Sequence, residues 1–282
     1  MANRSNKEVF KPQDAREQGF ETRDVLRDDF GFEIPTAVVP LPSRGSIYDD
    51  NSGLANLESL EIRAMTAKEE DILTSRALIK KGTVINELIK SCLIDKKIRV
   101  NQMIAGDRNA IMVALRVTGY GADYKVDVDC PSCAETSTQS FDLATLPIKR
   151  LGAQPLEPNT NMFEFQLPVS GKRVQFKFLT GVDEREMEVT AERKKKLLKT
   201  QVDSLITSRL IQAITSIEGV TDKNKISAFI RVMPAGDSRA LRKYFDDIEP
   251  GIDMQSWISC PNCSEESQVR MPLGASFFWP DA

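Results

Sequence analysis

The sequence contains no histidine in its 282 residues. This absence excludes Ser-His-Asp and Cys-His nucleophilic schemes, acid–base catalysis by imidazole, and any catalytic metal ligated by histidine. The phosphate-binding pattern G-x-x-x-x-G-K-[ST] and the dinucleotide-binding pattern G-x-G-x-x-G are also missing. Aspartate and glutamate are plentiful, but no spacing singles out an acid/base pair. We therefore expect a protein that is not an enzyme.

Long apolar runs are missing as well. No stretch approaches the roughly 18–20 apolar residues of a membrane span, and the N-terminus has no apolar region typical of a secretion signal. The net charge is −3, so we expect no global field that attracts nucleic acid or an anionic membrane. Apolar residues make up 41% of the chain, which is enough for a hydrophobic core in one or two domains.

Two short cysteine motifs are the most specific feature that is present, Cys130-Pro131-Ser132-Cys133 and Cys260-Pro261-Asn262-Cys263. Four thiolates form a complete tetrahedral ligand set for zinc. We therefore predict one structural Zn²⁺ per chain, bound by Cys130, Cys133, Cys260 and Cys263. The fifth cysteine, Cys92, lies in an apolar run and is expected to be a small core residue.

Two alternatives stay open for these motifs. Each pair could complete a metal site with a partner chain, or the pairs could be redox dithiols. Acidic and polar residues follow both motifs, and no cation stands there to favour a reactive thiolate. Cysteines used as ligands suit a reducing cytoplasm.

An internal repeat accounts for the wide separation of the two motifs. Cys133 and Cys260 are separated by 126 residues, whereas a single zinc ribbon usually needs roughly 15–20. A shift of 130 positions places residues 103–133 on residues 233–263 with 10 identities in 31 positions, against about two expected from average composition. We interpret this as a duplication in which each copy supplies one knuckle, and the two knuckles join in one Cys₄ zinc site.

The same order of elements is expected in both copies, which makes the fold class α+β: an internal duplication of a β-hairpin/helices/zinc-knuckle unit. The expected domains are an arm at 1–33, a first repeat at 34–150 and a second repeat at 151–282. Strands are expected at 34–39, 59–65, 162–167 and 174–179. Helices are expected at 67–81, 84–94, 107–118, 182–200, 202–217, 223–231 and 237–247.

Four local signals mark where these helices begin. Thr66-Ala67-Lys68-Glu69 is a capping-box pattern, and Thr180-Gly181-Val182-Asp183 is its less ideal counterpart. Asp107 and Asp237 each follow a glycine and are expected to be helix N-caps.

Both ends of the chain carry notable aromatic residues. They are single in the arm, whereas Phe277, Phe278 and Trp279 are adjacent, and at least one of these three is expected to pack on another subunit or on the other repeat, unless they cap the chain's own core. Residues 1–33 are dense in charge and have too few apolar residues for a core, so they form either a disordered tail or an extended arm. In the second interpretation the aromatic side chains bind neighbouring subunits. The candidate partner-binding residues are Phe10, Phe20, Phe30, Phe277, Phe278 and Trp279.

Several of these motifs together resemble a known family, the baseplate proteins of T-even-type contractile-tail bacteriophages. The resemblance covers about residues 35–282. The motifs are the proline turn Pro40-Leu41-Pro42-Ser43, the helix start at Thr66, the helix beginning Ala105-Gly106-Asp107, the Cys-Pro-x-Cys pairs and the closing run from Met271 to Phe278.

The resemblance implies a non-enzymatic structural or assembly protein of the tail baseplate, associated with the hub. Its implied partners are other baseplate and tail proteins, with the tape measure among the candidates, and no catalytic residue is implied. Its implied location is the virion tail baseplate, and the host cytoplasm during assembly. The alternative is a zinc-ribbon nucleic-acid-binding adaptor. The acidic balance of the chain, and the lack of interleaved basic and aromatic residues near the knuckles, speak against that alternative.

Overall fold

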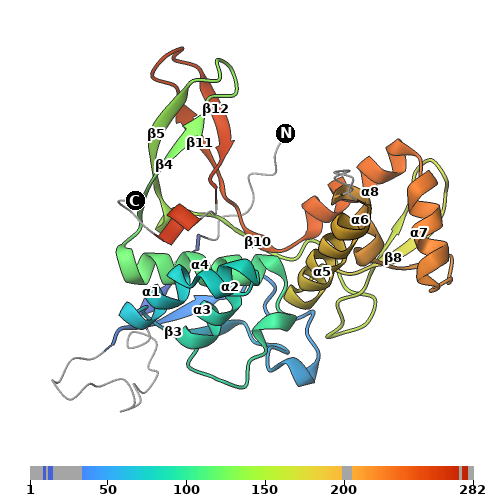
Figure 1. Ribbon diagram of the computed structural model, residues 1–282, viewed down its shortest axis with the longest axis horizontal. Coiled ribbons are helices and arrows are strands. Elements are labelled where there is room, and N and C mark those ends of the chain that lie inside the picture. The colour runs from blue at the N-terminus through green and yellow to red at the C-terminus, as the bar shows by residue number, and fades with distance from the viewer. Residues whose placement is uncertain (1–8, 11, 15–33, 199–204, 273–274, 279–282) are drawn as a thin grey trace.

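A computed structural model describes residues 9–10, 12–14, 34–198, 205–272 and 275–278. The chain combines helices with small antiparallel sheets, so the expected mixture of α and β structure is confirmed. Figure 1 shows two helical lobes and a protruding ribbon. We call residues 13–14 and 34–120 the first lobe, residues 151–248 the second lobe, and the hairpins at 123–142 and 255–270 the ribbon.

The first lobe is a three-stranded sheet covered by helices. Its strands are paired in the order β1-β2-β3, and all pairs are antiparallel. The strands are β1 (Gln13–Asp14), β2 (Thr36–Pro40) and β3 (Ser59–Arg63). The helices are α1 (Ala67–Thr74), α2 (Arg76–Lys80), α3 (Val84–Cys92) and α4 (Ala105–Tyr120). Helix α4 packs on β2, and α1 packs on α3.

The second lobe repeats this arrangement of a small sheet with helices against it. Its strands are paired in the order β7-β8-β9. The strands are β7 (Phe163–Gln166), β8 (Arg173–Phe176) and β9 (Ile214–Ile217). The helices are α5 (Gly181–Leu198), α6 (Leu205–Ala213), α7 (Lys223–Val232) and α8 (Ala235–Ile248). The expected hairpin at 162–179 is therefore confirmed in β7 and β8.

The ribbon is built from two hairpins that lie far apart in the sequence. One hairpin pairs β4 (Asp123–Asp129) with β5 (Thr136–Asp142), and the other pairs β11 (Gln255–Ser259) with β12 (Glu266–Arg270). Their registers correspond after a shift of 130, because Asp129 faces Thr136 in one and Ser259 faces Glu266 in the other. In Figure 1 the two hairpins stand side by side above α4, with their turns at the far end.

The two halves of the chain also meet at the foot of the ribbon. Strand β6 (Ile148–Lys149) pairs with β10 (Gly251–Ile252) in a short antiparallel sheet. Helix α4 packs against β10, and a Cβ atom on Gly106 would lie 1.8 Å from the carbonyl oxygen of Pro250. Only glycine allows the two backbones to approach this closely.

The expected helix limits need two corrections. The helix expected at 67–81 is broken at Ser75, whose extended backbone separates α1 from α2. The helix expected at 202–217 was wrong at its end, because α6 stops at Ala213 and residues 214–217 form β9. Pairing with the central strand β8 determines the conformation of this β-branched segment, Ile214-Thr215-Ser216-Ile217.

The N-cap role expected for Asp107 and Asp237 was also wrong. Helix α4 is capped at Ile104 and α8 at Pro234, in each case three residues before the aspartate. Both carboxylates lie inside the first helical turn, are fully buried, and bond to another element instead.

Each of these aspartates fixes the loop that joins two strands of its lobe. Asp107 accepts hydrogen bonds from Ser43 N (3.0 Å), Ser43 Oγ (2.6 Å) and Tyr48 Oη (2.5 Å). Asp237 accepts hydrogen bonds from Val169 N (2.7 Å) and Ser170 N (3.0 Å). Burial raises the pKa of Asp107, although the hydrogen bonds from Ser43 and Tyr48 oppose this shift.

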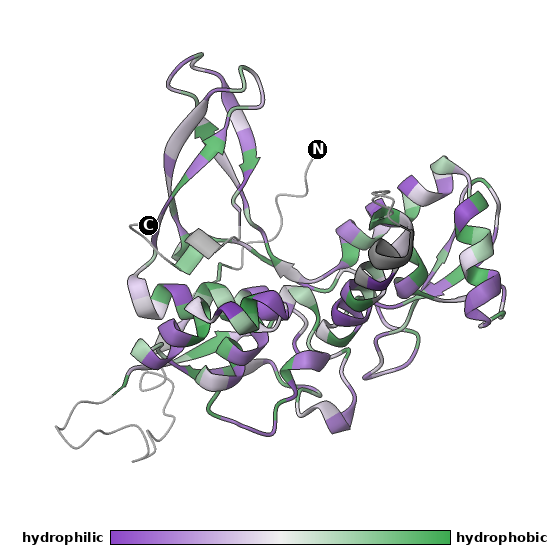
Figure 2. Ribbon diagram, in the orientation of Figure 1, coloured by the Kyte–Doolittle hydropathy of each residue, from purple (hydrophilic) through white to green (hydrophobic). Residues whose placement is uncertain are grey.

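One connected cluster of buried apolar side chains runs through the lobes and the ribbon. Figure 2 shows hydrophobic and hydrophilic residues side by side on the helices, as expected when each helix buries one face. The second lobe concentrates aromatic rings, with Phe176 in contact with Phe163, Phe178, Tyr244 and Phe245. Among the described residues, no helix is both long enough and apolar enough to cross a membrane.

Candidate metal centre

The four cysteines of the two motifs meet at the far end of the ribbon. Each motif forms the turn of one hairpin, between β4 and β5 or between β11 and β12. All four Sγ atoms lie within 4.8 Å of one another. The distance from Cys130 Sγ to Cys263 Sγ is 3.8 Å, and the distance from Cys133 Sγ to Cys260 Sγ is 3.7 Å. The two short distances thus join one hairpin to the other.

The two turns have the same backbone geometry. In the first, Cys130 N donates to Glu135 O (2.9 Å) and Ala134 N donates to Cys130 O (2.8 Å). In the second, Cys260 N donates to Glu265 O (3.0 Å) and Ser264 N donates to Cys260 O (2.9 Å). The residue after the second cysteine has φ = 58° in both turns, at Ala134 and at Ser264. This left-handed residue turns the chain back into the hairpin and leaves both sulfurs on one side.

The sulfur positions fit a tetrahedral ion. Four sulfurs at 2.3 Å from a central Zn²⁺ are separated by about 3.8 Å from one another. A disulfide would require about 2.05 Å, so the cysteines are paired with neither one another nor Cys92. The set offers four ligands and no open position, which suits a structural ion and gives no site for a substrate.

The thiols crowd one another electrostatically. Backbone N–H groups of Cys263 and Asn262 stabilise the Cys260 thiolate and lower its pKa to about 7. The Glu265 N–H lowers the pKa of Cys263 in the same way, but burial and the neighbouring thiols outweigh it and raise that pKa to about 12. Four thiolates in this space repel one another, and a divalent cation removes the repulsion.

The surroundings of the sulfurs differ within each pair. Cys130 and Cys260 are buried between the hairpins, whereas Cys133 and Cys263 lie at the surface. The amide of Asn262 donates to Cys133 Sγ at 3.8 Å, across the two turns. Cys92 is fully buried in the first lobe, where burial raises its pKa to about 12, so its expected place in the core is confirmed.

The aromatic candidates for partner binding lie inside the chain wherever the structure describes them. Phe10, Phe277 and Phe278 are 0%, 0% and 2% exposed. The ring of Phe277 packs edge-on against Tyr124 of the ribbon, 5.1 Å between centroids, and against Phe278, 5.3 Å. These three rings pack in the protein's own core, because removing apolar surface from water lowers the free energy of the folded chain. They therefore present no exposed face to a partner. The remaining candidates, Phe20, Phe30 and Trp279, lie outside the described residues.

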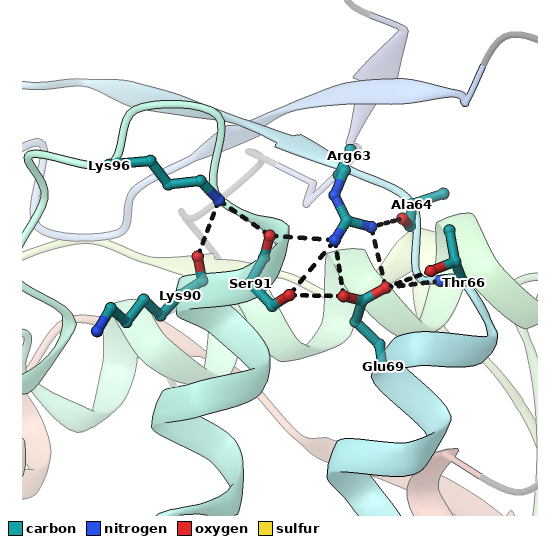
Figure 3. A network of polar contacts seen from close by, with 7 residues as sticks. All are labelled: Arg63, Ala64, Thr66, Glu69, Lys90, Ser91 and Lys96. Atoms are coloured by element: carbon teal, nitrogen blue, oxygen red, sulfur yellow. Dashed lines mark hydrogen bonds and ion pairs between the residues drawn. The ribbon is translucent and has the colours of Figure 1, made fainter. Parts of the chain in front are cut away.

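A buried ion-pair network between β3, α1 and α3 was not anticipated from the sequence (Figure 3). Arg63 donates two hydrogen bonds to the carboxylate of Glu69, at 2.9 and 2.6 Å. Thr66 N and Oγ1 donate to the same carboxylate, which confirms the expected capping box, and Ser91 Oγ donates to it at 2.6 Å. Lys96 Nζ donates to the carbonyls of Lys90 and Ser91 at the end of α3.

The second lobe contains the same network with different residues. Lys177 forms an ion pair with Asp183 at 2.6 Å, and Thr180 N and Oγ1 donate to that carboxylate. Gln212 takes the place of Ser91, donating to Asp183 at 3.0 Å. Lys223 Nζ donates to the carbonyl of Ile211 in the last turn of α6 at 3.4 Å and to that of Ile214, the first residue of β9, at 2.9 Å, much as Lys96 donates to carbonyls at the end of α3.

We call these two networks the first and second frames. Burial alone would raise the pKa of Glu69 and of Asp183, but the hydrogen bonds from Arg63 and Lys177 and the threonines outweigh it and hold both pKa values below the ordinary range. The signal that could have revealed the frames is a shared spacing. A basic residue, a threonine and an acidic residue follow one another at intervals of three in both lobes.

Comparison with known proteins supports one family. A family model described as T4 bacteriophage base plate protein matches residues 37–279. The resemblance inferred from the sequence motifs is thereby confirmed. No curated protein and no solved structure matches the chain.

Proposed function

The chain belongs to the family of T4 bacteriophage base plate proteins, and we propose that this structural protein of the phage tail baseplate is a zinc-clamped scaffold that holds several protein partners. The observation that carries the proposal is the meeting of four cysteines from two hairpins, with all Sγ atoms within 4.8 Å. A rigid ribbon that protrudes from two lobes is suited to positioning neighbouring proteins.

We further propose that Cys130, Cys133, Cys260 and Cys263 bind one structural Zn²⁺ per chain. The sulfur separations of 3.7 and 3.8 Å between the hairpins support this assignment. The ion would join the hairpin from the first half to the hairpin from the second half. Because the two motifs meet within one chain, the geometry favours an intramolecular site.

We also propose that residues 34–150 and 151–282 arose by duplication, with residues 1–33 as an arm. The two frames support this, because the same five contacts recur, with Lys177, Asp183 and Gln212 in place of Arg63, Glu69 and Ser91. The identical hydrogen bonds of the knuckle turns support it as well. A third support is the pair Asp107 and Asp237, each of which binds the strand-connecting loop of its own lobe.

We propose a non-enzymatic role, and the chemistry of the candidate site supports it. Four thiolate ligands saturate a tetrahedral ion, so the ion neither activates water nor polarises a substrate. The proposed place of action is the virion tail baseplate, with assembly in the host cytoplasm. The proposed partners are hub proteins and the tape measure.

A nucleic-acid adaptor is less well supported by the ribbon. The exposed face of β4 carries Asp123, Asp127 and Asp129 beside Lys125, so its net charge is negative. Asp127 and Asp129 accept hydrogen bonds from Thr138 and Thr136 at 2.6 Å, and Asp123 accepts one from Ser140. An acidic face repels a phosphate backbone, which binds through cations.

The proposal can be tested in phage particles and assembly intermediates. A phage that lacks the gene should be complemented by the wild-type chain, and mass spectrometry should find the chain in purified baseplates or their precursors. Normal tails formed without the chain would overturn the proposal. Its presence in precursors and absence from mature particles would identify an assembly factor, within the function proposed.

A further inference from the structure

A basic pocket lies on the first lobe between α1 and α3, next to the first frame. Its volume is about 430 Å³. The wall includes four cationic residues, Arg63, Lys68, Lys90 and Lys96, together with Ile72 and Glu87. Even with Glu87 at the wall and Glu69 behind it, the pocket has more positive than negative charge, on a chain whose net charge is −3.

Two of these cations already have partners in the first frame (Figure 3). Arg63 is bound to Glu69 through both terminal nitrogens. Lys96 donates to the carbonyls of Lys90 and Ser91, at 3.1 and 3.0 Å, where the negative end of the α3 dipole favours a cation. These two side chains stabilise the lobe.

The other two cations have no such role. Within the described part of the chain, neither Lys68 nor Lys90 forms an ion pair. Both side chains are exposed, and Figure 3 shows the Lys90 side chain extending from α3 away from the Arg63–Glu69 pair. Their ammonium groups are therefore available to an external anion.

The second frame forms without a lysine at either of these two positions. Lys68 lies two residues after Thr66, and the corresponding residue after Thr180 is Val182. Lys90 precedes Ser91, and the residue before Gln212 is Ile211. The second lobe thus builds the same frame with two apolar residues at these positions. The positive charge of Lys68 and Lys90 is therefore specific to the first lobe.

The neighbouring positive charges also disfavour one another. Burial lowers the pKa of Lys96, and repulsion from Arg63 and Lys68 lowers it further. An anion in the pocket would reduce this repulsion.

We propose that this pocket binds an acidic segment of another protein of the tail, with Lys68 and Lys90 as the residues that select carboxylate side chains. The inference rests on the proposed role as a scaffold with protein partners. The lysine ammonium group is a compact charge with three rotatable N–H donors. It can therefore donate hydrogen bonds to carboxylates that approach from several directions. Ile72 and the lysine stems supply apolar surface for the methylene groups of glutamate. None of the described residues that line the pocket is aromatic, whereas single-stranded nucleic acids are bound by stacking on aromatic rings.

The test uses the full chain and a fluorescent hexaglutamate peptide, with inorganic phosphate and a single-stranded oligonucleotide as competing probes. Binding is measured by anisotropy at low salt. The Lys68→Gln/Lys90→Gln variant should bind the peptide roughly tenfold more weakly, and Lys68→Arg/Lys90→Arg should keep most of the affinity because the charge is retained. The matched control is Lys172→Gln/Lys243→Gln, which removes two charges from exposed positions elsewhere.

A local reporter locates the bound peptide. In a sample with labelled isoleucine methyl groups, the Ile72 resonance should shift on peptide addition, and the Ile211 resonance in the second lobe should not. Equal loss of binding in the control variant, or an unperturbed Ile72, would overturn the proposal. Binding of the oligonucleotide in place of the peptide would also overturn the proposal. The same holds if phosphate, at the same total concentration of negative charge as the peptide, displaces the peptide completely. These measurements use purified protein, so their failure leaves the tail-complementation result, and with it the proposed function, unaffected.

Discussion

Arg116 Nε donates a hydrogen bond to Phe277 O at 2.9 Å and thereby ties the end of the described chain to helix α4. The Arg116 side chain is fully buried, and its other nitrogens bond to the carbonyls of Gly121 (2.7 Å) and Asp123 (3.0 Å). A buried cation of this kind requires several acceptors, and here three carbonyls supply them. The hydrogen bonds of Arg116 thus hold the foot of the ribbon, while the far end carries the four cysteines.

The burial of Phe277 predicts a structural role for this ring. Phe277→Ala should lower the free energy of unfolding by about 3–5 kcal/mol, because the change removes a buried ring and leaves a cavity. Denaturant unfolding followed by circular dichroism measures this loss. The control is Trp257→Ala on β11, where the side chain is 68% exposed and the change should stay within about 0.5 kcal/mol. Equal effects of the two variants would contradict the assignment of Phe277 to the core.

The cysteine cluster predicts one zinc ion per chain. Elemental analysis of anaerobically prepared protein should find one equivalent of zinc, and Cys130→Ser should abolish it. A structural zinc contributes on the order of 10 kcal/mol of apparent binding free energy, so the variant should loosen both hairpins of the ribbon. Cys92→Ser is the control and should retain the metal. Two ions per chain, or none in the wild-type protein, would contradict the prediction.

The first frame predicts a specific dependence of stability on pH. The pKa of Glu69 in the folded protein lies below its ordinary value of about 4.3. The stabilisation from its ionised form is therefore fully present above about pH 4.3 and is lost as the pH falls towards the folded pKa. Glu69→Gln should cost about 2–3 kcal/mol at pH 7, because Arg63 loses its counter-ion, and progressively less as the pH falls below about 4.3.

Urea unfolding at pH 7, 5 and 3 tests the Glu69 prediction. Glu58 is exposed, so Glu58→Gln is a suitable control and should leave the pH profile unchanged. An equal loss from Glu69→Gln at all three pH values would show that the carboxylate charge is not the source of the stabilisation.

The contact between Gly106 and Pro250 predicts a steric requirement. Gly106→Ala would place a Cβ atom 1.8 Å from the Pro250 carbonyl oxygen, so α4 and β10 must separate. We expect a loss of about 1–3 kcal/mol in thermal or denaturant unfolding. Gly119→Ala in the same helix is the matched control, because its nearest neighbour is the movable end of Met65, at 3.0 Å. Gly119→Ala should leave stability unchanged or raise it slightly, as alanine favours helix.

Local sequence signals anticipated a large part of the secondary structure. The capping box at Thr66 begins α1, and the alternating apolar residues of 163–176 form β7 and β8. These features depend on residues within a few positions of one another, so the local sequence is enough to predict where these elements form. The residue types and turn spacing of the four cysteines belong to the same class, because they already offer a set of thiol ligands suited to a metal ion.

Long-range contacts account for the elements that sequence reasoning missed. The segment 214–217 carries a pattern compatible with a helix, and its pairing with β8 makes it a strand. Asp107 resembles an N-cap in the sequence, but the approach of the loop at Ser43 makes it the buried acceptor for that loop. The two interaction partners, β8 for residues 214–217 and the loop at Ser43 for Asp107, become adjacent only when the chain folds.

The sequence by itself therefore determined the ligand chemistry, the internal similarity and the family, since these reside in residue type and spacing. The tertiary structure decided which side chains meet. It brought the two knuckles to one point, placed Phe277 in the core and set Lys68 beside a pocket on an otherwise acidic chain. The physical reason is that burial and charge neutralisation depend on which surfaces pack together, and that is a property of the folded chain as a whole.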